Sequence, residues 1–459
     1  MEGAQVLANL WRLAHLPPEA LAFAHLTGTD PVYPSSFRVA TAAQTTIAAA
    51  ALAACELGHA RGVPRQTVTV DAIHASAECL GWFSLDGRVP ELWDRFSGLY
   101  RTRDGWVRVH ANFPHHRDGA LRLLGLDPAT AQRKDAEEAM LRWDAVAFET
   151  AAAEDGLVAT ALRSFAEWDA TGQARAIAAQ PLMTITRVGD APPRALPALA
   201  PDQRPLEGVR VLDLTRILAG PVGGRALAAY GADVMLVNAP HLPNIDAIAD
   251  TSRGKRSALV DLRSPEGRAT MDDLLATTNV FVQGYRPGAL AALGYGCDEV
   301  VARRPGIVYV SLSAYGTQGP WKDRRGFDSL VQTATGFNLA EAEAAGDAAK
   351  PRPLPMQILD EAAGYLIAFG ASAALLRQQR EGGSWHVQVS LAQTGHWLRQ
   401  LGRVDDGFRG QPPDLEPFLE TSESGFGLLR ATRHSAQLGR TPACWTRPSA
   451  PPGSSPARW

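Results

Sequence analysis

The chain has 459 residues, which is longer than one ordinary domain, and 46% of them are hydrophobic, so we expect two or three globular domains. The net charge is −3 and the basic residues are scattered, which argues against a nucleic-acid partner or an anionic membrane surface. The four widely spaced cysteines form no disulfide framework and no metal-binding pattern. We see no signal peptide, and the apolar stretches Thr45–Cys55 and Leu366–Leu376 are too short to span a bilayer, so we expect a cytoplasmic protein.

The first part of the chain predicts an alanine-rich helix over Arg38–Leu57, a glycine-containing turn and the alternating strand QTVTVDA. The same order returns later as the helix after Asp360, the turn EGGSW and the strand HVQVSLA. Aligning the two helices places Ala40 opposite Asp360, so the first copy lacks the acid. We interpret residues 1–95 as a degenerate copy of the later segment, although alanine-rich helices also resemble one another by chance.

Residues 96–195 predict a smaller α+β domain. A strand over Trp106–Ala111 is followed by a helix, and further helical segments lie near Leu157–Gly172. The three histidines of HANFPHH follow the strand with no carboxylate or cysteine nearby. We therefore interpret them as exposed imidazoles of a loop and not as a metal site.

A proline-rich linker, Gly189–Gly208, leads into an alternation of short apolar strands and helices. This alternation predicts a parallel sheet covered by helices, hence a Rossmann-like α/β domain over residues 196–400. Residues 401–459 are expected to form a C-terminal segment with an irregular tail. The predicted strands are Val209–Leu214, Ala232–Asn238, Asn279–Tyr285, Ile307–Gly316 and Trp385–Ala392, and the predicted helices are Val222–Gly231, Glu266–Ala276, Asp298–Arg303 and the long helix after Asp360.

The turn TRILAGP follows the first of these strands, at the place where α/β folds bind nucleotide-like ligands. Its glycines do not have the spacing of a dinucleotide-binding motif, and small residues that pack a helix start are the more frequent explanation of such a turn. The basic loop Thr251–Ser257 is either a solvated turn or a contact for phosphates.

Asp360 stands at the head of the longest apolar helix. An aspartate in this position most often caps the helix, because its oxygen accepts a free backbone N–H. The alternative is a nucleophile that the positive end of the helix keeps ionised. The chain has no Walker loop, no Gly-x-Ser-x-Gly and no zinc spacing, which removes the common NTPase, hydrolase and metalloenzyme interpretations.

Taken in order, Leu206–Gln393 resembles the class III CoA-transferase family, which also contains α-methylacyl-CoA racemases. The resemblance rests on a long run of motifs that includes LEGVRVLDLTRILAGP, DTSRGKRSALVDLRSPEG, GFDSLVQTATG and LDEAAGYLIAFGASAALL. It implies the family III fold, with a Rossmann-like CoA-binding domain and a smaller α+β domain. The segments that resemble the smaller half precede the Asp360 helix here, whereas they follow it in the family, so we predict a permuted or fused-duplicate architecture.

The resemblance also implies a mechanism and a binding site. Asp360 would attack an acyl-CoA thioester to give an aspartyl anhydride and CoA thiolate, and the thiolate would return to form an aspartyl-CoA thioester. A small carboxylic acid would then collect the CoA. Family members form interlaced dimers, so a homodimer is implied. The CoA contacts carry over by position onto Ile217, Leu218, Ala219, Val260, Arg263, Tyr285 and Arg325.

The segment GFD places Phe327 where the racemase branch has a histidine, and a phenyl ring carries no proton. Racemisation is therefore disfavoured. Two alternatives to the transferase stay open: an acyl-CoA racemase, isomerase or dehydratase of the same fold, and a catalytically weak acyl-CoA-binding pseudoenzyme.

Two further positions depart from the family. Ala239 and Ala292 replace arginines that hold the nucleotide and phosphates of CoA, which predicts weaker binding. Arg286, Arg253 and Lys255 are the candidates to compensate for this loss.

Overall fold

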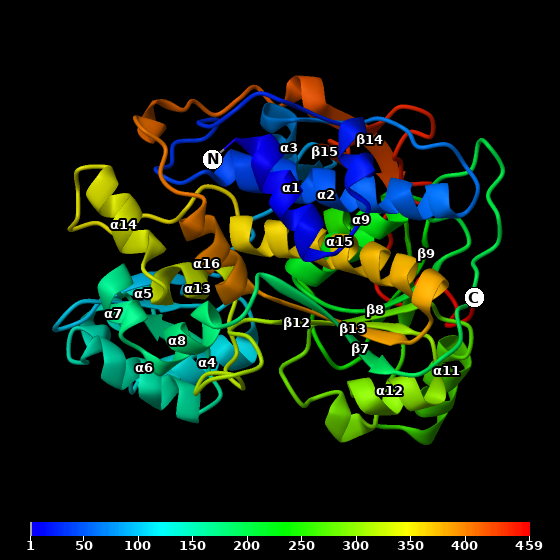
Figure 1. The fold of residues 1–459 in the computed structure, drawn as a ribbon. Helices are drawn as coiled ribbons and strands as arrows, with labels where there is room; N and C mark the ends of the chain where they lie inside the picture. The colour runs from blue at the N-terminus through cyan, green and yellow to red at the C-terminus, as the bar shows by residue number, and fades with distance from the viewer. Residues whose placement is uncertain (1) are drawn as a thin grey trace.

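A seven-stranded sheet forms the centre of the computed structural model, which describes residues 2–459 (Figure 1). The strand order is β10-β9-β8-β11-β12-β13-β7, and every neighbouring pair is parallel except β13 and β7. The predicted α/β fold class with a parallel sheet is confirmed. The strands are β7 (Met183–Gly189), β8 (Arg210–Leu214), β9 (Asp233–Asn238), β10 (Lys255–Leu259), β11 (Val280–Gln283), β12 (Val308–Ser313) and β13 (Ser384–Ser390).

Helices cover both faces of this sheet, as parallel strands with crossover connections require. In Figure 1, α9 and α15 lie on one side of the strands and α11 and α12 on the other. β7 lies before the boundary predicted at residue 195, yet it forms one edge of this sheet, whose other strands follow that boundary. The helices of this region are α9 (Ala219–Ala229), α10 (Ile248–Thr251), α11 (Pro265–Leu275), α12 (Cys297–Arg303), α15 (Ile358–Glu381), α16 (Leu391–Gln400) and the short 3-10 helix η2 (Ala291–Leu293).

The helices α9 and α15 cross at a point where both carry glycine. A Cβ atom on Gly223 would lie 2.8 Å from the carbonyl oxygen of Gly364, and a Cβ atom on Gly364 would lie 2.6 Å from that of Ala219. The two backbones therefore approach more closely than any side chain would allow. This contact holds the first turns of α15 against the turn that starts α9.

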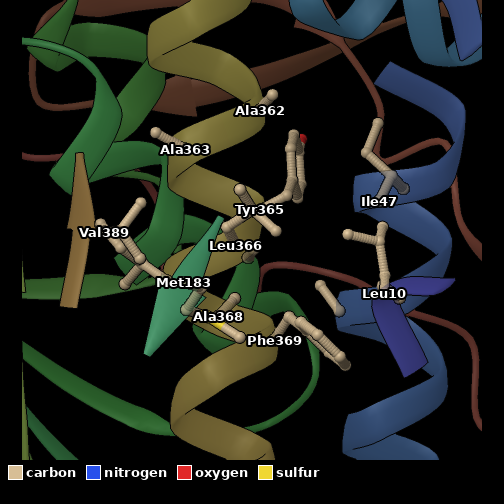
Figure 2. Close-up of a cluster of buried hydrophobic side chains, with 14 of the residues drawn as sticks. Leu10, Ile47, Met183, Ala362, Ala363, Tyr365, Leu366, Ala368, Phe369 and Val389 are labelled. Carbon is tan, nitrogen blue, oxygen red and sulfur yellow. The ribbon is translucent and has the colours of Figure 1, made fainter. Parts of the chain in front are cut away.

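A third layer from the N-terminal part of the chain covers α15. The helix α2 (Val39–Ala60) packs along it, and α1 (Gly3–Leu13) packs on α2. Figure 2 shows Leu10 and Ile47 on this layer, facing Tyr365 and Phe369 of α15. A sheet of order β1-β2-β16 lies beside α2. The remaining elements of this layer are η1 (Pro18–Phe23), β1 (Ala24–Thr27), β2 (Val68–Asp71), α3 (Ala72–Cys79) and β16 (Gln437–Leu438).

The apolar helices are longer than the sequence predicted. α2 and α15 run for 22 and 24 residues and have the length and composition of membrane-spanning helices, so the expectation of stretches too short to span a bilayer is wrong. The apolar windows of both helices are completely buried by the surrounding protein. Helices that form the core of a globular protein have the same composition.

The smaller α+β region has a three-stranded sheet and its own core around Val107, Met140 and Phe148. Residues 159–161, predicted as part of a helical segment, instead form a strand that pairs antiparallel with β5. The elements are β4 (Gly98–Arg101), β5 (Trp106–Val109), α4 (Pro114–Leu123), α5 (Arg133–Met140), α6 (Ala145–Glu154), β6 (Ala159–Ala161), α7 (Phe165–Asp169) and α8 (Gly172–Ala178).

The C-terminal segment returns across the molecule. Beyond β16 it has no helix or strand, yet it is anchored: the indole N–H of Trp445 donates to the carbonyl of Arg225 (2.9 Å) and that of Trp459 to the carbonyl of Leu274 (2.8 Å). The other elements are β3 (Phe83–Leu85), α13 (Asp328–Ala334), α14 (Phe337–Ala344), η3 (Gly407–Arg409), η4 (Glu416–Phe418), β14 (Leu419–Ser424) and β15 (Gly427–Thr432).

A buried polar network joins this segment to three helices. Glu78 of α3 accepts hydrogen bonds from Tyr365 of α15 (2.7 Å), from the backbone of Ser435 (2.7 Å) and, with a donor–acceptor distance of 2.9 Å, from His434. The other imidazole nitrogen of His434 lies 2.9 Å from the hydroxyl of Tyr230, which follows α9. Burial alone raises the pKa of Glu78, but its interactions with His434 and Arg225 outweigh burial and hold that pKa well below its ordinary value.

We expect Glu78→Gln to lower the free energy of unfolding by about 2 kcal/mol at neutral pH, because the amide cannot replace a charged acceptor for all three donors. A carboxyl whose pKa is lowered in the folded state stabilises above its unfolded pKa of about 4.3, and this contribution fades as the pH falls. The difference between wild type and variant should therefore shrink below about pH 4. Urea unfolding at several pH values measures it, and a pH-independent difference would contradict this account.

Candidate functional site

A buried ion pair stabilises the turn between β8 and α9. The ammonium of Lys255 donates to the carboxylate of Asp213 (2.8 Å) and to the carbonyl of Pro221 (2.7 Å) in the first turn of α9. Ile217 in this turn has a φ of +78°, a conformation that a β-branched residue adopts at a cost of about 1–3 kcal/mol. Such strain persists where the surroundings impose it, and it is concentrated at functional sites.

The start of α15 is capped by a different acid from the predicted one. Asp360 is the third residue of α15, and its side chain does not cap the helix. Asp328, the first residue of α13, accepts hydrogen bonds from the backbone N–H groups of Leu359 (2.7 Å) and Asp360 (3.0 Å). The capping role is therefore taken, and the carboxyl of Asp360 has no hydrogen-bond partner among residues 2–459.

The electrostatic expectation for Asp360 is wrong. Burial, and next the charge of Asp328, raise the pKa of Asp360 well above its ordinary value, so the helix N-terminus does not keep this carboxyl ionised. Burial also raises the pKa of Asp328, to about 6, although the two backbone N–H groups oppose this shift. Of the two buried carboxyls, Asp328 is the one whose ionised form the protein stabilises, since it has the hydrogen-bond donors.

Asp360 lies on the wall of a cavity of about 350 Å³. Segments distant in the sequence meet here, among them the β8–α9 turn, the loop after β11, the loop before α13 and the first turn of α4. The lining residues are Phe113, His115, His116, Arg216, Ile217, Leu218, Ala219, Leu242, Gly284, Tyr285, Arg286, Pro287, Ala289, Leu312, Ser313, Ala314, Arg324, Arg325, Gly326, Phe327, Asp360 and Leu391.

A second cavity of about 620 Å³ adjoins the first at Leu242 and at the loop that contains Tyr285 and Arg286. The structure brings all seven predicted CoA contacts to these two cavities. Ile217, Leu218, Ala219 and Arg325 line the first, Val260 and Arg263 line the second, and Tyr285 lines both. The two departures, Ala239 and Ala292, also lie on the second cavity. That the seven residues bind CoA stays a prediction.

The walls of the first cavity carry unpaired positive charge. Within residues 2–459, no carboxylate lies within ion-pair distance of Arg216, Arg286 or Arg325, which makes these arginines available to an anionic ligand. Of the three candidates to compensate for the lost arginines, only Arg286 reaches the cavities. Lys255 braces the β8–α9 turn, and Arg253 is buried in ion pairs with Asp250 and Glu420, so these two candidates were wrong.

The histidines after β5 are not an exposed loop. His110 and His116 are buried, and only His115 is exposed. His110 stacks on Phe327 with ring centroids 4.0 Å apart, and Nε2 of His116 accepts a hydrogen bond from Nη1 of Arg325 (3.2 Å). Burial, and next His115 and Arg325, lower the pKa of His116 to about 3, so this imidazole is neutral. Within residues 2–459 no group of three His, Cys, Asp or Glu side chains has a metal-binding arrangement.

We expect Arg286→Ala to weaken the binding of CoA about 10-fold, because the variant removes an unpaired guanidinium from the junction of both cavities. Isothermal titration with CoA measures this change. Arg409→Ala is the matched control, since the side chain of Arg409 is exposed and pairs with Asp406 outside both cavities. Equal affinities for both variants would exclude Arg286 from CoA binding.

Asp328, His116 and Arg216 were not predicted from the sequence as residues of this site. Asp328 stands inside the quoted motif GFD, but its role depends on a helix that begins 30 residues later. His116 lines the cavity although it belongs to the smaller α+β region, and no local sequence pattern predicts that a residue of this region lies there. Arg216 lies in the quoted turn TRILAGP and was passed over because the expectation there concerned the residues after it.

The sequence model of CoA-transferase family III matches residues 206–414, which include the central sheet, Asp328 and Asp360. Residues 206–414 belong to CoA-transferase family III. The predicted recognition of this family is confirmed, whereas the permuted or fused architecture is not addressed by the match.

The chain is 36% identical over 202 residues to a Mycobacterium tuberculosis protein named "Probable fatty acyl-CoA transferase Rv3272". The aligned segment covers 41% of this chain and 50% of that protein. It is 30% identical over 263 residues to succinate–glutarate CoA-transferase of Agrobacterium fabrum, 51% of this chain and 65% of that protein. The chain thus spans about half to two thirds of the length of these two family III relatives. The crystal structure of Rv3272 aligns with 44% of this chain and 58% of its own, at 35% identity and a TM-score of 0.40.

Proposed function

We propose that the protein is a family III CoA-transferase that moves CoA from an acyl-CoA thioester to a small carboxylic acid, with Asp360 as the covalent nucleophile. One observation carries the proposal: a carboxyl group without a hydrogen-bond partner faces a cationic cavity that adjoins a second one, and both are lined by the residues predicted to bind CoA. The names of the family III relatives support CoA thioesters as the substrates.

The proposed reaction begins when ionised Asp360 attacks the thioester carbonyl. The C–S bond breaks, and the products are an acyl-aspartyl anhydride and CoA thiolate. The thiolate attacks the aspartyl carbonyl, which releases the first carboxylate and leaves an aspartyl-CoA thioester. The acceptor carboxylate attacks this thioester, the thiolate leaves again, and its attack on the acceptor carbonyl of the new anhydride gives the product thioester and free Asp360.

The residues around Asp360 have distinct proposed roles. Asp328 fixes the first turn of α15. Burial, and next the charge of Asp328, keep the pKa of Asp360 high, so Asp360 has to lose a proton before it attacks. A carboxylate with a high pKa is a stronger nucleophile once it is ionised. Arg216, Arg286 and Arg325 hold anionic parts of the substrates in this proposal, and the neutral imidazole of His116 fixes Arg325.

The test is the intact mass of the protein after brief incubation with succinyl-, glutaryl- and acetyl-CoA. We expect a hydroxylamine-sensitive acyl or CoA adduct on the wild type and none on Asp360→Asn. Glu381→Gln is the matched control, because Glu381 is a half-exposed carboxylate at the last residue of the same helix, and this variant should still form the adduct.

The outcomes separate the alternatives. CoA binding without an adduct from any of the three thioesters would overturn the covalent mechanism and favour an acyl-CoA-binding pseudoenzyme. Exchange of the α-proton of an acyl-CoA in deuterated water, without CoA transfer, would favour an isomerase or racemase.

A further inference from the structure

Two parts of the chain have the same topology. The first unit is β1, α2, β2 and α3 (residues 24–79), and the second unit is β12, α15, β13 and α16 (residues 308–400). In each unit two parallel strands are joined across a long apolar helix. A short helix then starts directly after the second strand, and the last residue of that strand caps it, through Asp71 in the first unit and Ser390 in the second.

The two long helices also begin in the same way. Gly28-Thr29-Asp30 and Gly326-Phe327-Asp328 are corresponding segments. Asp30 accepts hydrogen bonds from the backbone N–H groups of the second and third residues of α2, Ala40 (2.8 Å) and Thr41 (3.0 Å). Asp328 does the same for the second and third residues of α15. By this register Thr41, and not Ala40 as the sequence alignment suggested, corresponds to Asp360.

The two units exchange the segments that follow them. The chain after the first unit folds into the smaller α+β region and returns as β7, which pairs antiparallel with β13 of the second unit. The chain after the second unit forms β14 and β15 and returns as β16, which pairs antiparallel with β2 of the first unit. Each unit's sheet is thus completed by the segment that follows the other unit.

Because of this exchange, residues from both parts of the chain line the cavity that contains Asp360. Its Phe113, His115 and His116 belong to the segment that follows the first unit, whereas Asp360 belongs to the second. The apolar windows of α2 and α15 are completely buried against one another and their neighbours within one chain. Among the described residues, neither of these two long helices leaves an apolar face that would require a second copy to cover it.

We propose that the first unit takes, inside a single chain, the place of a second subunit, so that the protein is a monomer and the Asp360 site is complete in one copy. The inference goes beyond the proposed function, because it concerns assembly and rests on topology. It replaces the homodimer that the family resemblance implies.

Light scattering coupled to size-exclusion chromatography tests the proposal on the full chain, from about 1 to 100 μM. We expect 49.1 kDa at every concentration. A mass near twice this value, or a mass that rises with concentration toward it, would overturn the proposal. The measurement needs no activity, so it decides the assembly even if the transferase mechanism fails.

Dilution of the wild type is the second readout. If it transfers CoA, its specific activity should stay constant down to nanomolar concentration, where a dimer held by a modest interface dissociates. A specific activity that falls on dilution and returns with added Asp360→Asn protein would show that a second chain contributes to the site, and the proposal would be wrong.

Discussion

Asp360→Asn should lower the turnover number for CoA transfer by a factor on the order of 10⁴ or more, because an amide cannot form the anhydride. CoA affinity should change by less than about 3-fold, since asparagine has the same size and matches the uncharged form that burial favours. Steady-state kinetics together with titration of CoA measure the two effects. A variant that keeps more than about a tenth of wild-type turnover would exclude Asp360 as the nucleophile.

Asp360→Asn should abolish activity, but we expect it to stabilise the folded protein at neutral pH. A carboxyl whose pKa is raised on folding is stabilising below its unfolded pKa, and this contribution is lost as the pH rises through the folded pKa. Asp360→Asn should therefore unfold at a higher temperature than the wild type at pH 7–8 and at the same temperature near pH 4. A variant that is less stable than the wild type at both pH values would mean that loss of activity reflects misfolding.

Gly364→Val should lower the free energy of unfolding by more than about 3 kcal/mol. A Cβ atom at this position meets the backbone oxygen of Ala219 at 2.6 Å and Cβ of Val222 at 2.8 Å, and neither atom can move without shifting α9. Forcing α9 and α15 apart also separates Asp360 from the Ile217–Ala219 turn, so activity should fall in the fraction that stays folded. Thermal unfolding followed by circular dichroism measures the loss.

Gly105→Ala is the matched control for this substitution. A Cβ atom on Gly105 would have no neighbour nearer than 4.0 Å, and its backbone conformation suits any residue. We expect a change within about 0.5 kcal/mol for this variant. Equal stability losses at Gly105 and Gly364 would show that the close approach of α9 and α15 is not what makes Gly364 necessary.

The sequence predicted five of the seven strands of the central sheet, because buried parallel strands are short apolar runs separated by helices. It did not predict β7, which precedes the linker, or β10, which begins inside the basic loop Thr251–Ser257. The seven residues to which the resemblance assigns CoA contacts all line the two cavities. The sequence did not predict those properties of a side chain that depend on a residue distant in the chain. The high pKa of Asp360 depends on burial and next on Asp328, and neither is visible in the sequence around Asp360.

The histidines show the same limit. HANFPHH is polar and follows a strand, which locally favours a loop exposed to water. His110 and His116 are buried only because the loop that contains Arg325 and Phe327 folds over them. Arg253 and Lys255 were misjudged for the related reason that their carboxylate partners Asp250, Glu420 and Asp213 could not be assigned by pattern.

The pairing of α2 with α15 has a consequence for biosynthesis. About 300 residues separate the two helices, and at roughly 5–20 residues per second a ribosome needs about 15–60 s to make that stretch. During this time the apolar surface of α2 has no α15 to cover it, and β1 and β2 lack their third strand. The nascent chain is therefore expected to depend on chaperones, and folding should be slow because its decisive contacts are so distant in sequence.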